Sequence, residues 1–422
     1  MQPLTHEEGL EVSFHELEFR PDRNEWIVGR QGTDEIIALP GIGMDAIRLL
    51  SAGRTVEETR SSLRASTGRD VDVRAFVERL ASAGLVASIG ERRFPVAQTP
   101  VSFPRVRSHH VRWLMNPVLH AVLLLVPVAA LAVAVARPGT FPSWDSFLWT
   151  EYGTFTVLVQ VLIGWCLIAL HEAAHLLTAR ATGVRGRIRL GTRLQFLVAQ
   201  TEVSGIWLKG RRARLTVYLS GIVLDAVIWG GCLLARAWGA DFVLLPVVVA
   251  TLFLALANQC LVFMRTDLYF VVQDLTGCRN LFTDTTRYLR HVAALPFGRR
   301  APHPLRSLPA RERRFVQGYA VAVVVGSVAC VAIGLQVLTQ VTWRLLHRSL
   351  VHLTDGSDWW SMLDALVTAL VLVGLHGLWM RLWWKRHGER VRRTVRSVRE
   401  RQGGRSAAAS SEGTSRRPGG AS

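Results

Sequence analysis

The sequence predicts an α-helical polytopic membrane protein of about six transmembrane helices, preceded by a small α/β domain. Half of the 422 residues are hydrophobic, and they gather in runs long enough to cross a bilayer core of about 30 Å. The formal net charge of +18 is concentrated between those runs and in the tail. This distribution indicates basic loops on one side of a membrane rather than a nucleic-acid-binding surface.

The first element is a soluble domain over residues 1–95, where no apolar run is long enough to span. Strand-like runs at 26–28 and 35–39 flank a turn at 31–34. Three helical patterns follow, at 43–50, from Thr55 onward and at 71–83. Thr55 and Glu58 match a capping box. A return strand is expected at 85–89.

A linker at 96–114 leads to the membrane domain, residues 115–383, and a basic tail follows at 384–422. Arginines crowd the segment before the first span and the second and fourth loops. The positive-inside rule then predicts a multi-pass protein of the cell (plasma) membrane with N- and C-termini in the cytoplasm. The tail is Arg-rich and then Gly/Ser/Ala-rich, which predicts disorder. The expected spans are 115–136, 154–178, 215–237, 242–264, 315–341 and 361–383.

A metal-binding pattern ends the second expected span. His171, Glu172 and His175 form an H-E-x-x-H sequence directly after the uncharged apolar run 154–170. On a helix this spacing places two imidazoles one turn apart, where both can bind a Zn²⁺ ion, and the Glu can take a proton from water. Ionisable residues within a span are costly and usually functional. The alternative is a pair of ordinary polar histidines at a helix end.

The third ligand is predicted to be Asp267, because it follows the fourth expected span and so lies on the same side as His171. Asp274 and Asp225 are the alternatives. Asp225 lies in the third expected span, where a lone carboxylate is costly. It is either a ligand or a hydrogen-bonding partner between helices.

Residues 185–208 are not expected to span. The runs 187–190 and 195–198 are strand-like, with a turn at 191–193. They form either a membrane-associated hairpin or a plain basic loop.

The N-terminal domain resembles the PqqD-like domain, a winged-helix module that binds leader peptides of ribosomally made, modified peptides. The resemblance implies that a peptide pairs with an exposed strand edge of residues 1–95. An unrelated winged helix or a regulatory domain is the alternative. The matching residues are Leu39-Pro40, Ile47-Arg48-Leu49-Leu50, Thr55-Val56-Glu57-Glu58, Phe76-Val77-Glu78-Arg79-Leu80 and Gly84-Leu85-Val86.

The membrane domain resembles the site-2 protease family of intramembrane zinc metallopeptidases over residues 154–281. His171-Glu172-Ala173-Ala174-His175 matches its first motif. Its peptide zinc metalloprotease branch carries a DGYYxxxDLxGxxNL pattern, in which Leu268 here replaces the Gly. Asn258 stands nine residues before Asp267, as part of a second family motif that matches partly. The residues that follow the branch pattern are Asp267-Leu268-Tyr269-Phe270, Gln273-Asp274-Leu275-Thr276-Gly277 and Asn280-Leu281.

These observations together predict an intramembrane zinc metalloendopeptidase that processes a ribosomally made precursor peptide. His171, His175 and Asp267 would hold Zn²⁺, Glu172 would serve as general base and then acid, and Asn258 would orient substrate or stabilise an oxyanion. The expected partners are the precursor peptide, the lipid bilayer, and a peptide-modifying enzyme or exporter, with no nucleic acid. Two alternatives remain: a non-catalytic membrane partner for export of, or self-protection against, a modified peptide, and a regulatory site-2-type protease.

Overall fold

The computed structural model describes residues 9–22, 25–30, 35–95, 100–193, 196–278, 280–297, 303–355 and 358–414. The N-terminal part contains two antiparallel sheets of strand order β1-β5-β6 and β2-β3-β4. The hairpin, three helices and return strand expected from the sequence all form, whereas the turn at 31–34 lies outside the described residues. The elements are β1 (Val12–Phe14), β2 (Leu17–Asp22), β3 (Glu25–Arg30), β4 (Ile36–Pro40), α1 (Gly41–Ser51), α2 (Val56–Thr67), α3 (Val73–Ser82), β5 (Val86–Ile89) and β6 (Arg92–Arg93).

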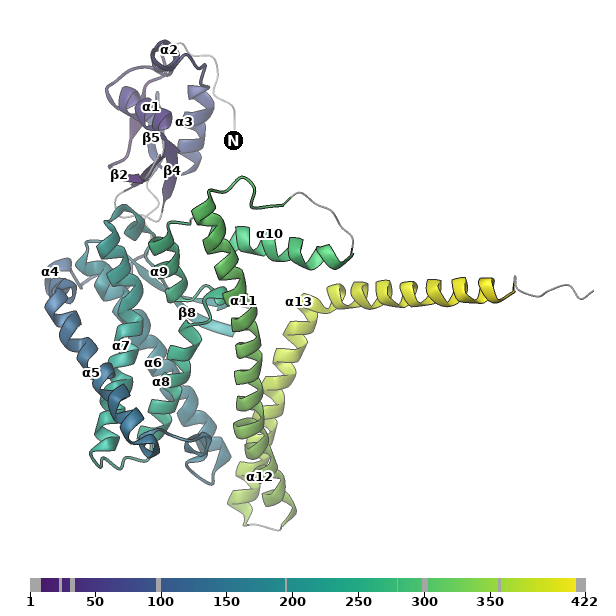
Figure 1. The fold of residues 1–422 in the computed structure, drawn as a ribbon. Helices are drawn as coiled ribbons and strands as arrows, with labels where there is room; N and C mark the ends of the chain where they lie inside the picture. Colours follow the sequence, from purple (N-terminus) through teal and green to yellow (C-terminus); the bar gives the residue numbers. More distant parts are fainter. Residues whose placement is uncertain are drawn as a thin grey trace, which may run out of the picture. The chain divides into compact units, whose positions relative to one another are not determined.

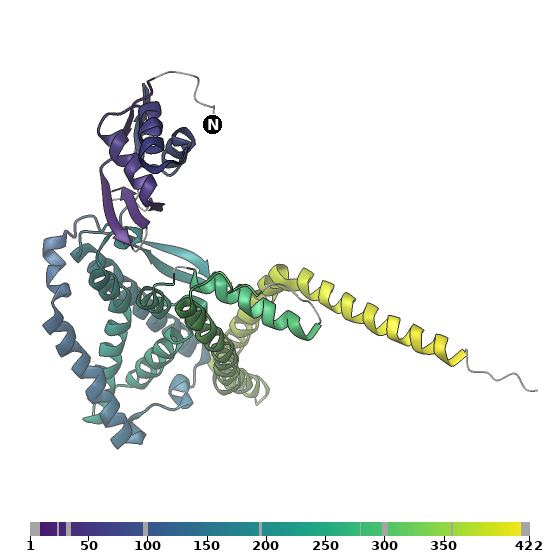
Figure 2. The same cartoon turned by 45° about the horizontal axis from the view of Figure 1, so that its top comes forward.

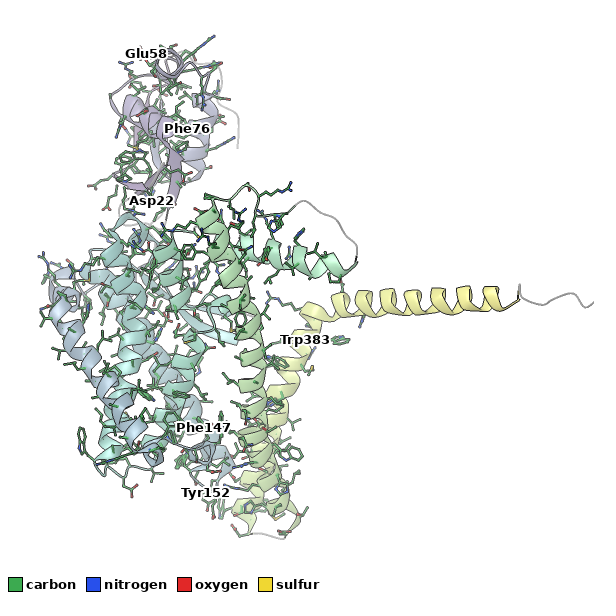
Figure 3. All side chains as sticks on the ribbon, in the orientation of Figure 1. Asp22, Glu58, Phe76, Phe147, Tyr152 and Trp383 are labelled. Atoms are coloured by element: carbon green, nitrogen blue, oxygen red, sulfur yellow. The ribbon has the colours of Figure 1, made fainter. Side chains whose placement is uncertain are left out.

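The N-terminal core lies between these helices and strands. Val28, Ile47, Leu80 and Leu85 are fully or almost fully buried in one hydrophobic cluster, and Phe76 packs against it (Figure 3). The predicted capping box is present, since the backbone N–H of Thr55 donates to Glu58 and that of Glu58 donates to Thr55 Oγ1. Burial of the apolar stripe of each helix supplies most of the stability of such short elements.

Within the part of the chain that the structure describes, five helices are long and apolar enough to cross a membrane, which is consistent with an α-helical membrane protein. Helix α11 continues through a π-helical turn, η7 (Leu338–Thr342), into α12 (Trp343–Thr354), and α13 is apolar over Trp359–Arg386. The remaining bounds are α5 (Pro117–Ala136), α6 (Gly153–Ala181), α7 (Arg211–Ala237), α11 (Ala310–Val337) and α13 (Trp359–Thr414).

The expected span at 242–264 is corrected by the structure. Helix α8 (Leu245–Gln259) has 15 residues, which gives a length of about 22 Å, short of a bilayer core of about 30 Å. The chain then turns through η5 (Val262–Met264), and Arg265 adopts a left-handed backbone with φ of 58°. This turn directs the chain into helix α9 (Asp267–Thr276). An apolar composition alone does not reveal such an early helix end.

The connecting segments include the hairpin predicted between the second and third spans. Strand β7 continues through Arg193, so the turn expected at 191–193 is wrong, and residues 194–195 lie outside the described part. These segments are α4 (Ser108–Val111), η1 (Arg112–Met115), η2 (Pro138–Thr140), η3 (Trp144–Leu148), β7 (Arg187–Arg193), β8 (Phe196–Glu202), η4 (Ser204–Leu208), α10 (Leu281–Ala294) and η6 (Leu295–Phe297).

Helix α7 lies at the centre of the helical packing, where it packs against α5, α8 and α9 (Figure 1). A Cβ on Gly230 of α7 would lie 3.0 Å from the Cα of Pro127, so glycine permits α5 and α7 to approach closely. Trp229, Leu233 and Leu252 belong to one buried cluster between these helices. Helix α10 runs across the axis of α11 in both views (Figures 1 and 2).

The chain folds into two compact units, and the smaller one comprises Thr150–Val157, Thr192–Val198 and Thr342–Ser422. Within it, the carboxylate of Asp364 accepts the backbone N–H groups of Gly153 and Thr154 at 2.8 and 3.0 Å. An acidic group at this position satisfies the first free N–H groups of α6 and complements its dipole.

Helix α13 continues to Thr414, although the sequence predicted a disordered tail from residue 384. Arginine is the most frequent residue of this stretch, and it has high helix propensity. Residues 415–422 lie outside the described part.

Candidate metal centre

Two histidines of α6 bring their Nε2 atoms close together. His171 and His175 are four residues apart, so they lie on one face of the helix. Their Nε2 atoms are 3.1 Å apart, and the exposed fractions of the two residues are 9% and 6%. The spacing read from the sequence therefore produces a buried pair of imidazole nitrogens.

Asp267 completes the cluster from the first turn of α9. Its Oδ2 lies 2.9 Å from Nε2 of His171 and 3.3 Å from Nε2 of His175. These three residues form a group whose ligand atoms all lie within 4.8 Å of one another. In a tetrahedral zinc site with bonds of about 2.0–2.1 Å, ligand atoms are about 3.3 Å apart. The donor set and its spacing thus fit a zinc ion with one further position for water.

The electrostatics of Asp267 favour a bound cation. Burial alone would raise the pKa of its carboxyl group, but hydrogen bonds with His171 and His175 outweigh burial and hold that pKa well below its usual range. The carboxylate is therefore ionised in a site where it can balance positive charge.

Helix α7 orients both imidazoles. Asp225, which is buried, contacts Nδ1 of His171 through Oδ2 at 2.7 Å. Nδ1 of His175 contacts the carbonyl oxygen of Val217 at 2.7 Å. With a metal ion bound, each Nδ1–H would donate to its acceptor on α7, so that each Nε2 could offer its lone pair to the ion. Of the two interpretations of Asp225, the structure supports an interhelical hydrogen-bonding partner.

The backbone of α7 approaches the histidines at Gly221. A Cβ built on this residue would lie 2.6 Å from Nε2 of both His171 and His175. Any side chain would therefore occupy the space between the ligands and α7. The sequence showed one glycine among many in the spans, and only the helix packing reveals its position.

Gln259, the last residue of α8, holds Asp267 in place. Its Nε2 donates to Asp267 Oδ2 at 3.1 Å, and its Oε1 accepts the backbone N–H of Asp267 at 3.2 Å. Thr266 Oγ1 donates to the Gln259 carbonyl. Asn258, the residue singled out from the sequence, lies one position earlier and is exposed. Sequence reasoning thus missed Gln259, which lies beside the residue it chose.

Glu172 lies on the same helix but is engaged by the hairpin. Its Oε2 accepts the backbone N–H of Thr201 at 2.7 Å, and Thr201 Oγ1 donates to its carbonyl oxygen at 3.1 Å. Strand β8 therefore lies beside the metal-binding helix. Glu202 accepts from Arg187 and Arg189 of β7 at 2.6 and 3.0 Å. Burial raises the pKa of Glu202, but these two guanidinium groups lower it by more.

Asp274 is held away from the cluster by an ion pair. Both of its oxygens accept from Arg214 of α7, at 2.6 and 2.9 Å, and both side chains are buried. Because Asp267 and Asp274 lie near the two ends of α9, this pair anchors the end of the helix remote from Asp267.

Comparison of the chain with models of protein families, with curated proteins and with solved structures found no match. The resemblances described above therefore stay predictions from the residues. The convergence of His171, His175 and Asp267 is a finding that does not depend on them.

Proposed function

We propose that the protein is a membrane-embedded zinc metalloendopeptidase. The observation that carries this proposal is the convergence of His171, His175 and Asp267. The two histidines and Glu172 belong to α6, a helix apolar enough to span a membrane, and Asp267 begins α9. Three protein ligands with an open position are typical of catalytic zinc sites, whereas structural sites have four protein ligands. When bound, zinc would polarise a peptide carbonyl and lower the pKa of water.

The side chains of this site have distinct proposed roles. Glu172 would accept a proton from the attacking water and deliver it to the leaving amine nitrogen. Asn258 would orient the substrate or stabilise the developing oxyanion. Asp225 and Gln259 would act as positioning residues, since they contact ligands. The hairpin strand β8 would flank an extended substrate, because Thr201 already contacts Glu172.

The proposed substrate is a ribosomally made precursor peptide, bound first by the N-terminal domain. Within the described part, β4 has one paired side, toward β3. Arg30 donates to the carbonyl of Glu35, and hydrogen-bonded pairs alternate along an antiparallel ladder. The backbone groups of Ile36 and Ala38 therefore point away from β3. This edge suits a peptide that joins the sheet as a further strand.

The proposed location is the plasma membrane, with both termini in the cytoplasm. The arginine-rich segments before α5, between α6 and α7 and before α11 support this orientation. The precursor peptide would then meet the N-terminal domain where it is made. A peptide-modifying enzyme or an exporter would be a further partner.

Glu172→Gln tests the enzymatic function most sharply. The amide preserves the shape of the side chain but cannot act as a base. We expect zinc content to stay unchanged while cleavage falls by about 10²-fold or more. The measurement is mass spectrometry of the precursor peptide with purified protein. Glu151→Gln, an exposed residue just before α6, is the matched control and should cleave normally. Identical products from both variants would end the catalytic interpretation.

A second function is favoured by one observation. Glu172 is engaged by Thr201, and Leu268 replaces the Gly of the resembling branch, as suits a non-catalytic partner for export of, or self-protection against, a modified peptide. In that case Glu172→Gln would leave export or protection intact, whereas His171→Ala would abolish zinc and weaken both. A regulatory protease that cuts a membrane-bound regulator would instead lose activity in Glu172→Gln without requiring a precursor peptide.

A further inference from the structure

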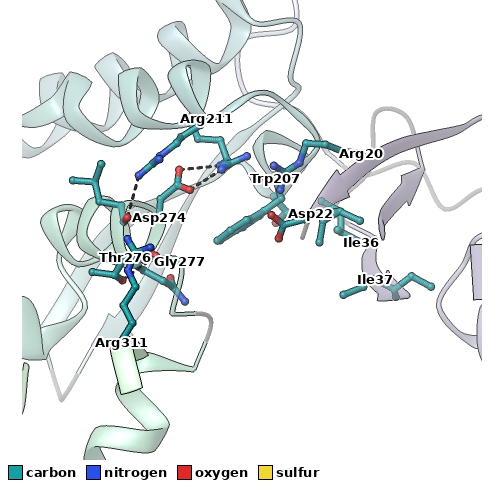
Figure 4. A pocket seen from close by; sticks show the side chains of 16 residues that line it. Arg20, Asp22, Ile36, Ile37, Trp207, Arg211, Asp274, Thr276, Gly277 and Arg311 are labelled. Atoms are coloured by element: carbon teal, nitrogen blue, oxygen red, sulfur yellow. Dashed lines mark hydrogen bonds and ion pairs between the residues drawn. The ribbon is translucent and has the colours of Figure 1, made fainter. Parts of the chain in front are cut away.

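A cavity of about 730 Å³ lies apart from the metal centre. Its volume is within the range of about 300–1,000 Å³ typical of ligand pockets. One wall comes from the N-terminal sheet and the other from η4 and the ends of α7, α9 and α11 (Figure 4). The lining residues are Arg20, Asp22, Ile27, Ile36, Ile37, Ala38, Ser204, Trp207, Arg211, Arg214, Gln273, Asp274, Leu275, Thr276, Gly277 and Arg311.

The wall from the sheet is mainly the face opposite the N-terminal core. Arg20, Ile27 and Ala38 are directly opposite one another across β2, β3 and β4, so their side chains emerge on one face. Val28, one residue along, is buried in the core on the other face. The cavity is therefore lined mainly by the face of the sheet. Ile36 and Ile37 of β4 also line it, so the edge of β4 that is unpaired within the described residues lies at the rim of the cavity.

Contacts from η4 close this face at one end. Lys209 Nζ lies 3.0 Å from Glu18 Oε2 on β2. A Cβ on Gly29 of β3 would lie 2.9 Å from Leu208 Cδ1, so glycine leaves room for that leucine. The sheet and η4 are thus fitted to each other beside the cavity.

The charge of the cavity is positive. Four arginines and two aspartates line it. Arg214 and Asp274 neutralise each other in their buried pair, which leaves Arg20, Arg211 and Arg311 against Asp22. Arg211 and Arg311 belong to the wall formed by the helix ends, and Ile27, Ile36 and Ala38 provide apolar surface on the sheet wall. An occupant with acidic groups on one side and apolar groups on the other complements this lining.

An extended peptide fits this description better than a lipid phosphate. Successive side chains of an extended strand point to opposite sides, so alternate acidic and apolar residues would reach the two walls. The lining also includes Asp22, whose negative charge disfavours a phosphate. Ile36 and Ala38 offer backbone groups at the rim.

We infer that this cavity binds an acidic, extended segment of the peptide that the protein acts on, and that Arg211 and Arg311 select it. The identity of this peptide as the substrate rests on the proposed function. The site itself requires only the cavity and its charges, so binding and cleavage can be tested separately.

The test uses full-length protein carrying Glu172→Gln in detergent, so that no cleavage intervenes. The probe is a fluorescein-labelled octapeptide of alternating Glu and Val, with a Gln–Val peptide for comparison, and binding is read by fluorescence anisotropy at 150 mM salt. We expect the Gln–Val peptide to bind about tenfold more weakly, since two partly exposed ion pairs together contribute about 1.4 kcal/mol.

Arginine variants locate the site on the protein, and neighbouring arginines outside the cavity provide a matched control. Arg211→Gln with Arg311→Gln should weaken the Glu–Val peptide about tenfold and leave the Gln–Val peptide unchanged. Arg212→Gln with Arg313→Gln removes the same charge from exposed residues outside the cavity and should change neither. Circular dichroism of each variant checks that the fold is retained.

Three results would overturn the inference. One is equal affinity for the two peptides, and another is an equal loss in the control double variant, which would mark nonspecific attraction to a basic protein. The third is displacement of the peptide by short-chain phosphatidylglycerol from wild type but not from the Arg211/Arg311 variant, which would assign the cavity to anionic lipid. In protein with Glu172 intact, Arg211→Gln with Arg311→Gln should weaken binding of the Glu–Val peptide while zinc content stays unchanged, so this site can fail without the catalytic proposal failing.

Discussion

Asp225 Oδ2 lies 2.7 Å from Nδ1 of His171, and both residues are buried. This contact joins α7 to the metal-binding helix and selects which nitrogen of His171 faces Asp267. A carboxylate behind a ligand histidine fixes the ring and raises its basicity. The costly carboxylate in the third span is thereby explained as a partner of His171, which it would support in the proposed metal centre.

Replacement of Asp225 should weaken zinc binding without removing a ligand. We expect Asp225→Leu to lower zinc affinity by about 100-fold and Asp225→Asn, which keeps an acceptor, by about tenfold. Competition with a chelating dye measures both. Ser220→Ala is the control, because His175 keeps the Val217 carbonyl as its main acceptor. An unchanged affinity in Asp225→Leu would show that His171 needs no such partner.

Gly221→Ala should empty the metal centre by steric conflict. The added methyl would lie 2.6 Å from both Nε2 atoms, and relief of such overpacking typically costs about 1–3 kcal/mol. We expect zinc affinity to fall at least tenfold. Gly231→Ala on the same helix is the matched control, because a Cβ there meets no atom within 4 Å. Full zinc occupancy in Gly221→Ala, by elemental analysis, would contradict the close approach of α7.

Gln259 and Asn258 should separate metal binding from catalysis. Gln259→Ala removes two hydrogen bonds to Asp267, each of which contributes about 1 kcal/mol. We expect zinc affinity to fall about tenfold to thirtyfold.

Asn258→Ala should keep zinc within twofold, and cleavage should fall by about 10²-fold if Asn258 stabilises the oxyanion. Zinc titration and peptide cleavage are compared on both variants. Equal zinc loss in the two would mean that Asn258 also supports Asp267.

Asp274→Asn should destabilise the protein more than it affects zinc. It leaves Arg214 buried without its counter-ion, a change that typically lowers the free energy of unfolding by about 3–5 kcal/mol. We expect a lower Tm in detergent but normal zinc content in the folded protein. The double variant Arg214→Met with Asp274→Leu removes both charges and should recover most of the Tm. Zinc loss in well-folded Asp274→Asn would instead return Asp274 to the metal centre.

The sequence predicted those parts of the site that depend on local periodicity. The four-residue spacing of His171 and His175 requires only a helix. Asp267 was reached by counting 242–264 as a span, whereas the structure has the shorter helix α8 there. Asp225 and Gly221 acquire their roles only when α7 lies against α6, and no local pattern reports that contact. Gln259 was hidden because α8 was expected to run on to residue 264, whereas its early end places Gln259 beside Asp267. Strands β1 and β2 were also missed, since short strands carry little periodic signal.

The hydrogen bond from the backbone N–H of Thr201 holds the Glu172 carboxylate in one position most of the time. A hydrogen bond to a charged group contributes about 1.5–3 kcal/mol net, so only about 1–10% of molecules would hold Glu172 released at any moment. If Glu172 is the base, the observed rate of hydrolysis is scaled by that small fraction, and any peptide that draws β8 toward itself raises the rate without touching zinc.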